Sequence, residues 1–370
     1  TIMVKKSDAN DTKIYQFYKE KYYEHKKQFD KLIILIQCGD FYEVYDKKNS
    51  DGEYELGPIE DYSRFTNYRI KMKKDGTYMS GCPISVDLDD LKEKCHAEHY
   101  VVIIYEQEET KVNKKRVIKR VLAEISTPGT SISFNDMYTQ NKKTNNLMIA
   151  WLYFCKATTK KIPTMVCGLS NIDMVSGDCN IHEYTVRNYK FKKLHNYDDI
   201  ETFYSIYNPS EVIFVHNFED DKEINEIKKC CGMSCLTRIH NLKTDEKCKK
   251  LHNDKKNVYK MTILKKFYNI TDYFNFLDIY ELDQSEIALK ALVYNLDIIM
   301  TYNPKIITTI KQPIFKDVNT YIKLRNSVLK QLNIINCSES NHHNKTFNSL
   351  VNLVNKCKTP MGKRRLNNML

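Results

Sequence analysis

The chain has 370 residues, of which 58 are basic and 47 acidic, so its formal net charge at pH 7 is +11. This length exceeds one ordinary domain and predicts two or three, and a hydrophobic content of 42% is enough for a core in each. No apolar run approaches the ~20 residues that cross a bilayer. Twelve cysteines without a leader-like N-terminus indicate a reducing, intracellular compartment. The net charge favours a polyanionic partner, although basic and acidic residues are interspersed.

The N-terminal segment leads to a turn with a distinctive composition. Aromatic residues at helical spacing predict an amphipathic helix over residues 12–30, and the apolar run 32–36 predicts a buried strand. The pair Gly39-Asp40 then predicts a tight turn, which brings Phe41 and Glu43 to the edge of a rigid element. In a basic protein this arrangement suggests an apolar wedge that separates a base step beside a carboxylate that reads the disturbed base. The competing interpretation is that both aromatics, Phe41 and Tyr42, are core residues and Glu43 is a solvated turn residue. The pattern by itself favours this interpretation, because apolar wedges are rarer than core aromatics.

The rest of the first domain mixes strands and helices without strict alternation, which predicts an α/β fold with a mixed sheet. Residues 87–95 carry acids in a helical first turn, residues 101–105 form a β-branched strand, and residues 47–78 show little period. Six basic residues follow the strand and are either a solvated hairpin or contacts to phosphates. They are Lys111, Lys114, Lys115, Arg116, Lys119 and Arg120.

A second α/β domain and a helical segment follow a polar linker. Pro128-Gly129 ends the first domain. The next part predicts a buried strand, a hairpin, a short strand and a helix at residues 147–154, 166–184, 211–215 and 220–230. From residue 258 the apolar period becomes helical, with a long helix predicted over residues 279–302 and another over 347–357.

Six segments resemble, in the same order, segments of the MutS family of DNA mismatch-repair proteins. They are GDFYE at 39–43, YMSGCP at 78–83, YVVIIYEQ at 100–107, RVLAEISTPGT at 120–130, GLSNIDMVSG at 168–177 and TPMGKRRL at 359–366. The resemblance implies a multidomain α/β chain with these parts: a mismatch-binding domain at residues 1–134, a linker at 135–146, an RNase H-like connector at 147–260, and the truncated start of a helical lever core at 261–370. We therefore expect the chain to be a piece of a longer polypeptide.

The resemblance also implies a role for three residues. Phe41 would enter the minor groove and stack on a mispaired or unpaired base, Glu43 would hydrogen-bond that base, and Met79 would line the groove. Residues 85–87 (SVD) depart from the family, which usually has an aromatic and a histidine there.

The implied activity is binding of mismatched DNA in mismatch repair, without catalysis by this chain. An ATPase needs a Gly-x-x-x-x-Gly-Lys-[Ser/Thr] loop, and Gly362-Lys363 lacks both the upstream glycine and the hydroxyl residue. By resemblance, ATP and magnesium belong to a family domain beyond this chain, and we expect no cofactor here. The expected partners are double-stranded DNA with mispairs or small loops, a second subunit in a homo- or heterodimer, and a downstream MutL-like protein, with no membrane.

Other interpretations remain open at this point. An RNase H-like, metal-dependent nuclease needs converging carboxylates, and Asp173, Asp178 and Glu183 are the candidates. The spacing of Cys231, Cys235, Cys248 and His252 is near that of a zinc site, although the expectation is that no metal binds. A third alternative is a DNA-binding or interaction module without mismatch preference.

Overall fold

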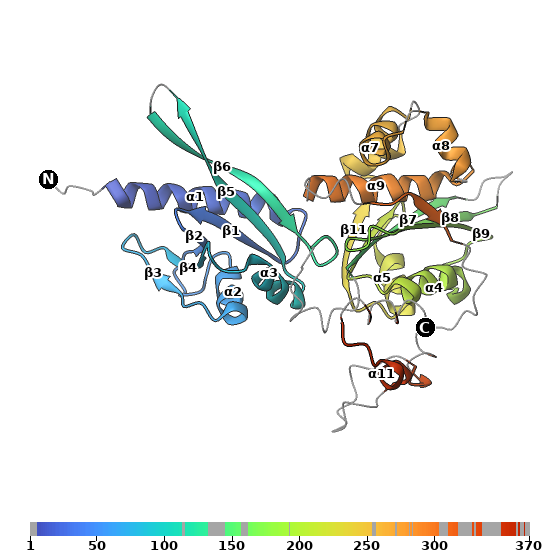
Figure 1. Cartoon of the computed structure of the whole chain (residues 1–370), viewed down its shortest axis with the longest axis horizontal. Coiled ribbons are helices and arrows are strands. Elements are labelled where there is room, and N and C mark those ends of the chain that lie inside the picture. The colour runs from blue at the N-terminus through green and yellow to red at the C-terminus, as the bar shows by residue number, and fades with distance from the viewer. Residues whose placement is uncertain are drawn as a thin grey trace. The chain divides into compact units, whose positions relative to one another are not determined.

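A computed structural model gives the three-dimensional structure (Figure 1). It describes residues 6–112, 115–131, 145–156, 162–191, 193–253, 257–270, 272–280, 282, 284–302, 310–316, 328, 331–334, 349–359, 362 and 366. The chain divides into two compact units, Thr1–Asn135 and Asp136–Leu370, which are described separately. Within the described residues no helix is long and apolar enough to span a membrane.

The first unit contains a six-stranded sheet with helices on both faces. In chain order its elements are α1 (Lys6–Lys26), β1 (Leu32–Cys38), β2 (Phe41–Asp46), α2 (Pro58–Thr66), β3 (Lys71–Met72), β4 (Tyr78–Pro83), α3 (Leu88–Ala97), β5 (Val101–Val112) and β6 (Lys115–Ser126). The strand order is β3-β4-β2-β1-β5-β6. Strands β1 and β5 are parallel and the other neighbours are antiparallel, so the predicted mixed sheet is confirmed.

Alternate residues of β2 face the two helical layers. Tyr45 meets Tyr18 of α1 edge to face at 5.8 Å between ring centres. Tyr42 points to the other face, where its strand partner Cys82 contacts Tyr62 of α2. A sheet covered on both faces requires apolar residues at successive positions. The run in β1 that predicted a buried strand meets this requirement, because five of its residues are buried.

The polar segment 47–78 is organised by one carboxylate at the end of β2. Asp46 accepts hydrogen bonds from the backbone N–H groups of Lys47 (2.7 Å), Leu56 (3.1 Å) and Gly57 (2.8 Å). Gly57 has φ +89° and directly precedes α2. The sequence analysis did not predict α2 or β3, although Pro58 at the start of α2 and the acids Glu60 and Asp61 in its first turn are local signals of a helix start.

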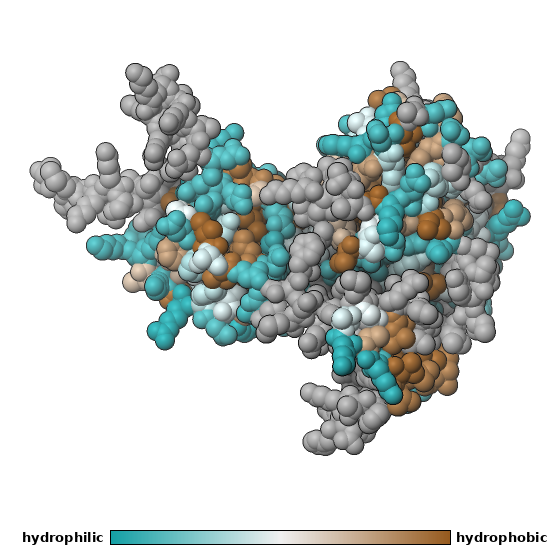
Figure 2. Space-filling model, in the orientation of Figure 1, coloured by the Kyte–Doolittle hydropathy of each residue, from teal (hydrophilic) through white to brown (hydrophobic). Residues whose placement is uncertain are grey.

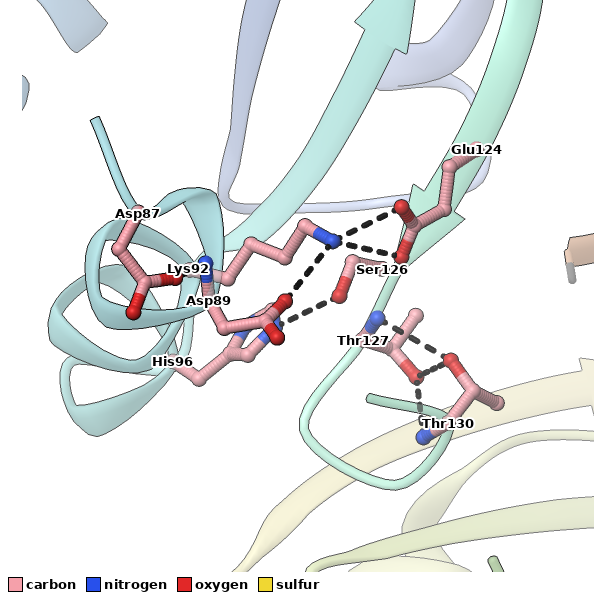
Figure 3. Close-up of polar contacts among 8 residues, drawn as sticks. All are labelled: Asp87, Asp89, Lys92, His96, Glu124, Ser126, Thr127 and Thr130. Carbon is pink, nitrogen blue, oxygen red and sulfur yellow. Dashed lines mark hydrogen bonds and ion pairs between the residues drawn. The ribbon is translucent and has the colours of Figure 1, made fainter. Parts of the chain in front are cut away.

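The far end of the first unit is tied together by polar contacts between α3 and β6 (Figure 3). The ammonium group of Lys92 lies 2.8 Å from the carboxylate of Glu124, and the His96 ring lies 3.0 Å from the hydroxyl of Ser126. The hydroxyls of Thr127 and Thr130 are 2.9 Å apart, in the turn that follows β6. These buried or half-buried contacts close the unit directly after its last strand.

The second unit contains another mixed six-stranded sheet, of order β11-β10-β7-β8-β9-β12. Its strands are β7 (Asn146–Cys155), β8 (Thr164–Asp173), β9 (Cys179–Arg187), β10 (Glu211–His216), β11 (Leu236–Asn241) and β12 (Pro313–Phe315). Its helices are η1 (Leu194–Tyr197), α4 (Asp198–Tyr207), α5 (Lys222–Cys230), α6 (Glu246–His252), α7 (Val258–Tyr268), α8 (Tyr273–Ile279), α9 (Glu286–Tyr302) and α11 (Leu350–Val354). On the face drawn in Figure 2, hydrophilic and hydrophobic residues are mixed over the described surface of each unit.

Helix α9 covers one face of the second sheet, and α4 with α5 covers the other (Figure 1). Trp151 of β7 meets Tyr294 of α9 edge to face at 6.0 Å. The side-chain amide of Asn295 donates to the backbone oxygen of Leu147 at 3.1 Å. Helix α9 is therefore packed on strands that precede it by more than a hundred residues.

Two helix predictions in this part of the chain differ from the structure. The helix predicted over residues 279–302 begins only at Glu286, as α9, because Ile279 is the last residue of α8. Of the described residues in the helix predicted over 347–357, only Leu350–Val354 of α11 are helical. The apolar period continues across the break because Leu282, between the two helices, is itself buried.

The closest approach between α9 and the sheet predicts a sensitive position. A Cβ atom on Gly168 would lie 2.4 Å from the backbone N of Ala288 and 2.4 Å from the backbone C of Ile287. Because a helix backbone cannot yield locally, Gly168→Ala should destabilise the second unit by about 3 kcal/mol. Urea unfolding followed by the fluorescence of Trp151, the single tryptophan, measures this loss.

Gly232→Ala is the control for backbone conformation alone. Gly232 has φ +59°, and no atom lies within 4 Å of the place that an added Cβ would take, so the cost should be about 1 kcal/mol. Equal losses in the two variants would contradict the close-approach explanation.

Candidate nucleic-acid interface

The turn before Phe41 is a two-residue connection that needs glycine. Cys38 and Phe41 are directly paired across β1 and β2, which leaves Gly39 and Asp40 as the loop. Gly39 has φ +59°, and Asp40 is not among the described residues with positive φ. This combination is typical of a type II′ hairpin turn, whose first central residue is usually glycine.

Two glutamines hold this turn from the neighbouring strands. The side-chain oxygen of Gln107 accepts a hydrogen bond from the Gly39 N–H at 3.4 Å, and the Gln37 amide donates to the Gly39 oxygen at 3.3 Å. The backbone N–H of Gln107 in turn donates to the Gln37 side chain at 2.9 Å. On the other side, the Ile84 N–H donates to the Asp40 oxygen at 2.9 Å. The turn is thereby fixed to both β5 and the end of β4.

Phe41 is presented at the surface by this turn. Its side chain is 47% exposed, whereas the other five residues of β2 are buried. The competing interpretation of this pair is therefore wrong for both residues: Phe41 is not part of the core, and Glu43 is a nearly buried strand residue. Tyr42, by contrast, is a core residue at 5% exposure.

Glu43 lies on the same face as Phe41 and is engaged by its own protein. The Tyr45 hydroxyl donates to Glu43 Oε2, and the ammonium of Lys73 lies 3.9 Å from the same oxygen. The Tyr45 hydroxyl is also 3.4 Å from Cys38 Sγ. Burial raises the pKa of Tyr45 far above its ordinary value and also raises the pKa of the Cys38 thiol. Both groups therefore keep their protons near neutral pH and can donate.

Gly81 keeps open the space beside Glu43. It is directly opposite Glu43 in the β2–β4 ladder, and a Cβ atom there would lie 2.4 Å from the Tyr42 carbonyl oxygen and 3.1 Å from the Glu43 Cα. A side chain at this position would displace the strand that carries both Phe41 and Glu43.

Met79 shares this face but is not adjacent to Phe41. It is half-buried in β4 and directly opposite Tyr45, whereas Pro83 is the residue opposite Phe41. Phe41, Glu43 and Tyr45 form a row along this face of β2. The strand register places Met79 at the Tyr45 end of that row, next to Lys71 of β3.

Of the six predicted phosphate contacts, two have side chains that the structure describes. Lys119 is exposed, and Arg120 is half-buried with its Nη2 atom 3.8 Å from Cys38 Sγ. Arg120 is opposite Gln107 in the β5–β6 ladder, at the same end of the sheet as Phe41. Lys111, Lys115 and Arg116 belong to β5 and β6, but their side chains, and the whole of Lys114, lie outside the described part.

A second group of basic residues was missed by the sequence analysis. Arg69, Lys71 and Lys74 are exposed and Lys73 is half-buried, all in or beside β3, with Met72 66% exposed among them. The signal was a period of two in Arg69, Lys71 and Lys73, which places their side chains on one face of an extended segment. Lys73 and Arg120 therefore lie on opposite sides of the row Phe41–Glu43.

The three carboxylates proposed for a nuclease have separate contacts in the second unit. Asp173 accepts from the Val175 N–H at 2.8 Å and so shapes the β8–β9 turn, and Asp178 pairs with Lys311 at 2.8 Å. Glu183 accepts from the Ala288 N–H at 2.8 Å in the first turn of α9.

The residues with zinc-like spacing are also distributed among different contacts. Cys231 belongs to the apolar cluster under α4 and α5, and Cys248 is buried in α6. The His252 ring packs on Tyr153 at 4.8 Å between ring centres. Among the residues that the structure describes, no group of three His, Cys, Asp or Glu side chains could hold a metal ion.

Comparison with known proteins finds similarity to one family. The family model described as MutS domain I matches residues 17–135. A putative DNA mismatch repair protein, a mutS homolog of Acanthamoeba polyphaga mimivirus, is 25% identical over 98% of this chain and 34% of its own length. The DNA mismatch repair protein MutS of Caldanaerobacter subterraneus is 24% identical over 95% of this chain and 35% of its own length. That of Parabacteroides distasonis is 29% identical over 49% of this chain and 19% of its own length.

These findings define a class of domain and then a likeness to a family. The first unit is a MutS domain I, a mixed-sheet α/β domain with Phe41 exposed beside its first hairpin turn. Over nearly its whole length the chain is similar to MutS proteins, and the match to domain I supports a likeness to their N-terminal portion. It spans about a third of the length of the two relatives that match nearly all of it. The part matched by the family model is not the ATPase domain.

A solved structure of Fowlpox virus resolvase with Holliday junction DNA was also found, at 16% identity. It covers 40% of this chain and 97% of the resolvase chain, with a TM-score of 0.24, which is too low to support a conclusion about fold or function.

A buried histidine predicts how acid affects the face that carries Phe41. His25 Nε2 lies 2.8 Å from the Tyr105 hydroxyl, so this contact links α1 to β5. Burial lowers the pKa of His25 below its ordinary 6.5, which means that the folded state prefers the neutral ring. The contribution of His25 to stability is therefore complete above pH 6.5 and is lost as the pH falls below it. Hydrogen exchange of the β1 amides, corrected for intrinsic rates, should show more opening at pH 5.5 than at 7.5.

His25→Gln should reduce this pH dependence, because glutamine can bond to Tyr105 without titrating. His99→Asn is the matched control: His99 is exposed with φ +64°, which asparagine tolerates, so its removal should leave the pH profile unchanged. If the pH dependence of hydrogen exchange in His25→Gln equals that of the native chain, His25 is not the group responsible for it.

Proposed function

We propose that this chain binds duplex DNA and tests its base steps with Phe41, as the mismatch-recognising part of a mismatch-repair protein. The observation that carries the proposal is the exposure of Phe41, 47%, at the start of a strand that is otherwise buried. A large apolar side chain that leaves 47% of its surface exposed beside a fixed turn is available to contact DNA, and it has the shape of an inserted wedge.

The energetics of insertion supply the discrimination. Separating two stacked base pairs costs a few kcal/mol, and the cost is smallest where pairing is already defective. The free-energy cost of insertion to the protein is the same at every base step, whereas the cost to the DNA is smallest at a defect. The wedge therefore stays inserted longest at a mispair or an unpaired base. Deformable DNA also bends more readily, so most of the readout is indirect.

The residues around Phe41 have complementary roles in this proposal. Glu43 accepts a hydrogen bond from the disturbed base, and Met79 lies against the groove further along the same face. Lys119, Arg120 and the β3 group contact phosphates, which adds affinity that depends on salt but not on sequence. The chain thus acts by binding rather than by catalysis.

The relatives are described as DNA mismatch repair proteins, and they are about three times as long as the matched part. We propose that the corresponding whole protein couples base testing to an ATPase that uses ATP and magnesium outside this chain. By the same argument it functions as a homo- or heterodimer around DNA and engages a downstream MutL-like protein.

The test is the affinity of the chain for a duplex with one mispair or one unpaired base, against its fully paired twin at fixed salt. The native chain should prefer the defective duplex. Phe41→Ala should lose most of that preference while retaining binding to the paired duplex, because the phosphate contacts remain.

Tyr23→Ala is a matched control, because Tyr23 is 48% exposed on α1 of the same unit. It should leave the preference unchanged. Equal binding of the native chain to both duplexes would reduce the proposal to a DNA-binding module without mismatch preference.

The phosphate role predicts a change in salt dependence. Lys119→Gln should weaken binding to both duplexes equally and reduce the slope of log affinity against log salt by about 0.9. Lys27→Gln should have no effect, because Lys27 is exposed before β1, at the end of that strand remote from Cys38 and Phe41. Fluorescence anisotropy at salt concentrations from about 50 to about 200 mM measures the slope for each variant. A change confined to the defective duplex would argue against a simple phosphate contact.

A further inference from the structure

The side-chain amide of Gln107 is bonded to the turn before Phe41 at one end only. Its oxygen accepts a hydrogen bond from the Gly39 N–H at 3.4 Å. Because an amide oxygen accepts hydrogen bonds and an amide nitrogen donates them, this contact fixes which end of the group faces the turn. Within the described part of the chain the Nε2 atom of Gln107 has no hydrogen-bond partner, and solvent reaches it because the side chain is only half-buried.

Gln107 lies on the same face of the sheet as Phe41. It is directly opposite Arg120, whose guanidinium reaches Cys38 Sγ, and Cys38 is directly opposite Phe41. Tyr105, two residues earlier on β5, packs on α1, and alternate residues of a strand share a face. The two N–H groups on Nε2 are therefore presented beside the exposed ring, on its β5 side.

The polar groups on the two sides of Phe41 have opposite hydrogen-bonding characters. Glu43 of β2 offers carboxylate oxygens, which accept, whereas Gln107 of β5 offers amide N–H groups, which donate. The minor groove presents base acceptors, and its one base donor is the 2-amino group of guanine. An amide donor held against this groove can bond a base acceptor, but it is opposed by the guanine amino group because two donors cannot bond to each other.

We propose that Gln107 is a specificity-determining residue: its Nε2 atom donates to the minor-groove edge of a base pair that flanks the step opened by Phe41, and this contact favours A·T over G·C there. The inference rests on the proposed function and adds to it a dependence on the neighbouring sequence. Because the amide oxygen is bonded to the turn, the donor is fixed relative to the Phe41 ring. A flanking pair without the guanine amino group therefore meets a donor that is already in place.

A contact between Gln107 and a phosphate would not have this dependence, because phosphate contacts carry no sequence information. Phosphates also bind charged donors more strongly than neutral ones, and Lys119 and Arg120 of the adjacent strand β6 are charged. The dependence on the flanking pair is therefore the property that tests the proposal.

The experiment varies the minor-groove amino group while the defect stays the same. One duplex carries an unpaired base between two G·C pairs, and in the other both flanking pairs are inosine·C, which lacks the amino group. The native chain should bind the inosine duplex more tightly. Part of this affinity ratio reflects the weaker inosine·C pair, and every variant shares that part. Gln107→Met removes the donor and should lower the ratio about two- to tenfold, the usual contribution of one hydrogen bond.

Two further variants separate donation to DNA from support of the turn. Gln107→Glu keeps an oxygen for the Gly39 N–H but presents an acceptor to the guanine amino group, so its ratio should fall below that of Gln107→Met. Gln37→Met is the matched control, because it removes the other side-chain bond to Gly39 and leaves the side-chain amide of Gln107 intact. It should weaken binding to both duplexes equally and keep the native ratio.

The outcomes separate this inference from the proposed function. Equal ratios in the native chain, Gln107→Met and Gln107→Glu would refute the base contact and leave the Phe41 wedge untouched. If the native chain does not prefer defective duplexes, or if Phe41→Ala keeps that preference, the wedge is refuted and this inference fails with it. Thermal unfolding of each variant excludes loss of fold, and Gln107→Glu, which retains the turn contact, decides the question should Gln107→Met be poorly folded.

Discussion

The hairpin between β1 and β2 is the constraint on which the candidate interface depends. Because Cys38 pairs directly with Phe41, only two residues can form the turn, and the first of them must accept a positive φ. One more residue in the loop would move the register by one and exchange the two faces of β2. Phe41 and Glu43 would then point toward α2, and the core residue Tyr42 would face α1.

The face that carries Phe41 is unusual in combining a packed apolar half with a polar half. Toward α1, Tyr45 and Tyr105 are covered by the aromatic residues Tyr18 and Phe17. Toward the turn, the contacts are polar and pass from Arg120 through Cys38 and Tyr45 to Glu43 and Lys73. Buried polar groups are costly unless each has a partner, so this row can be kept only if its members are fixed together. The result is a rigid base for one exposed aromatic ring.

Local patterns predicted much of this structure, and contacts between distant residues account for the remainder. The apolar run of β1, the turn at Gly39 and the helix α3 with its N-cap Asp87 follow from spacing and turn chemistry alone. Helix α2 was missed although Pro58 and the acids of its first turn are local start signals. What no local pattern contains is the anchor of its start, because Asp46 accepts hydrogen bonds from the loop ten residues later. The division between α8 and α9 was missed because Leu282 is buried although it is not helical. For the site, the turn predicted that Phe41 lies at the edge of a rigid element, but its exposure was expected only from the family resemblance. The ion pair beside it was not predicted. Lys73 approaches Glu43 only through the β2–β4–β3 register, which no local pattern contains.

The glutamine contacts also impose an order on the folding of the first unit. Gln107 is 68 residues after Gly39 and 70 after Gln37, yet it bonds to both, through the parallel pairing of β1 with β5. Contacts of such sequence separation form late, because the intervening chain must first be closed into a loop. During synthesis, the hairpin can pair locally as soon as β2 has emerged, but its turn cannot reach its final geometry until β5 follows. The strand pairing that contains Phe41 therefore forms before the contacts that fix the direction of its ring. The presentation of Phe41 at the surface is a late event in folding.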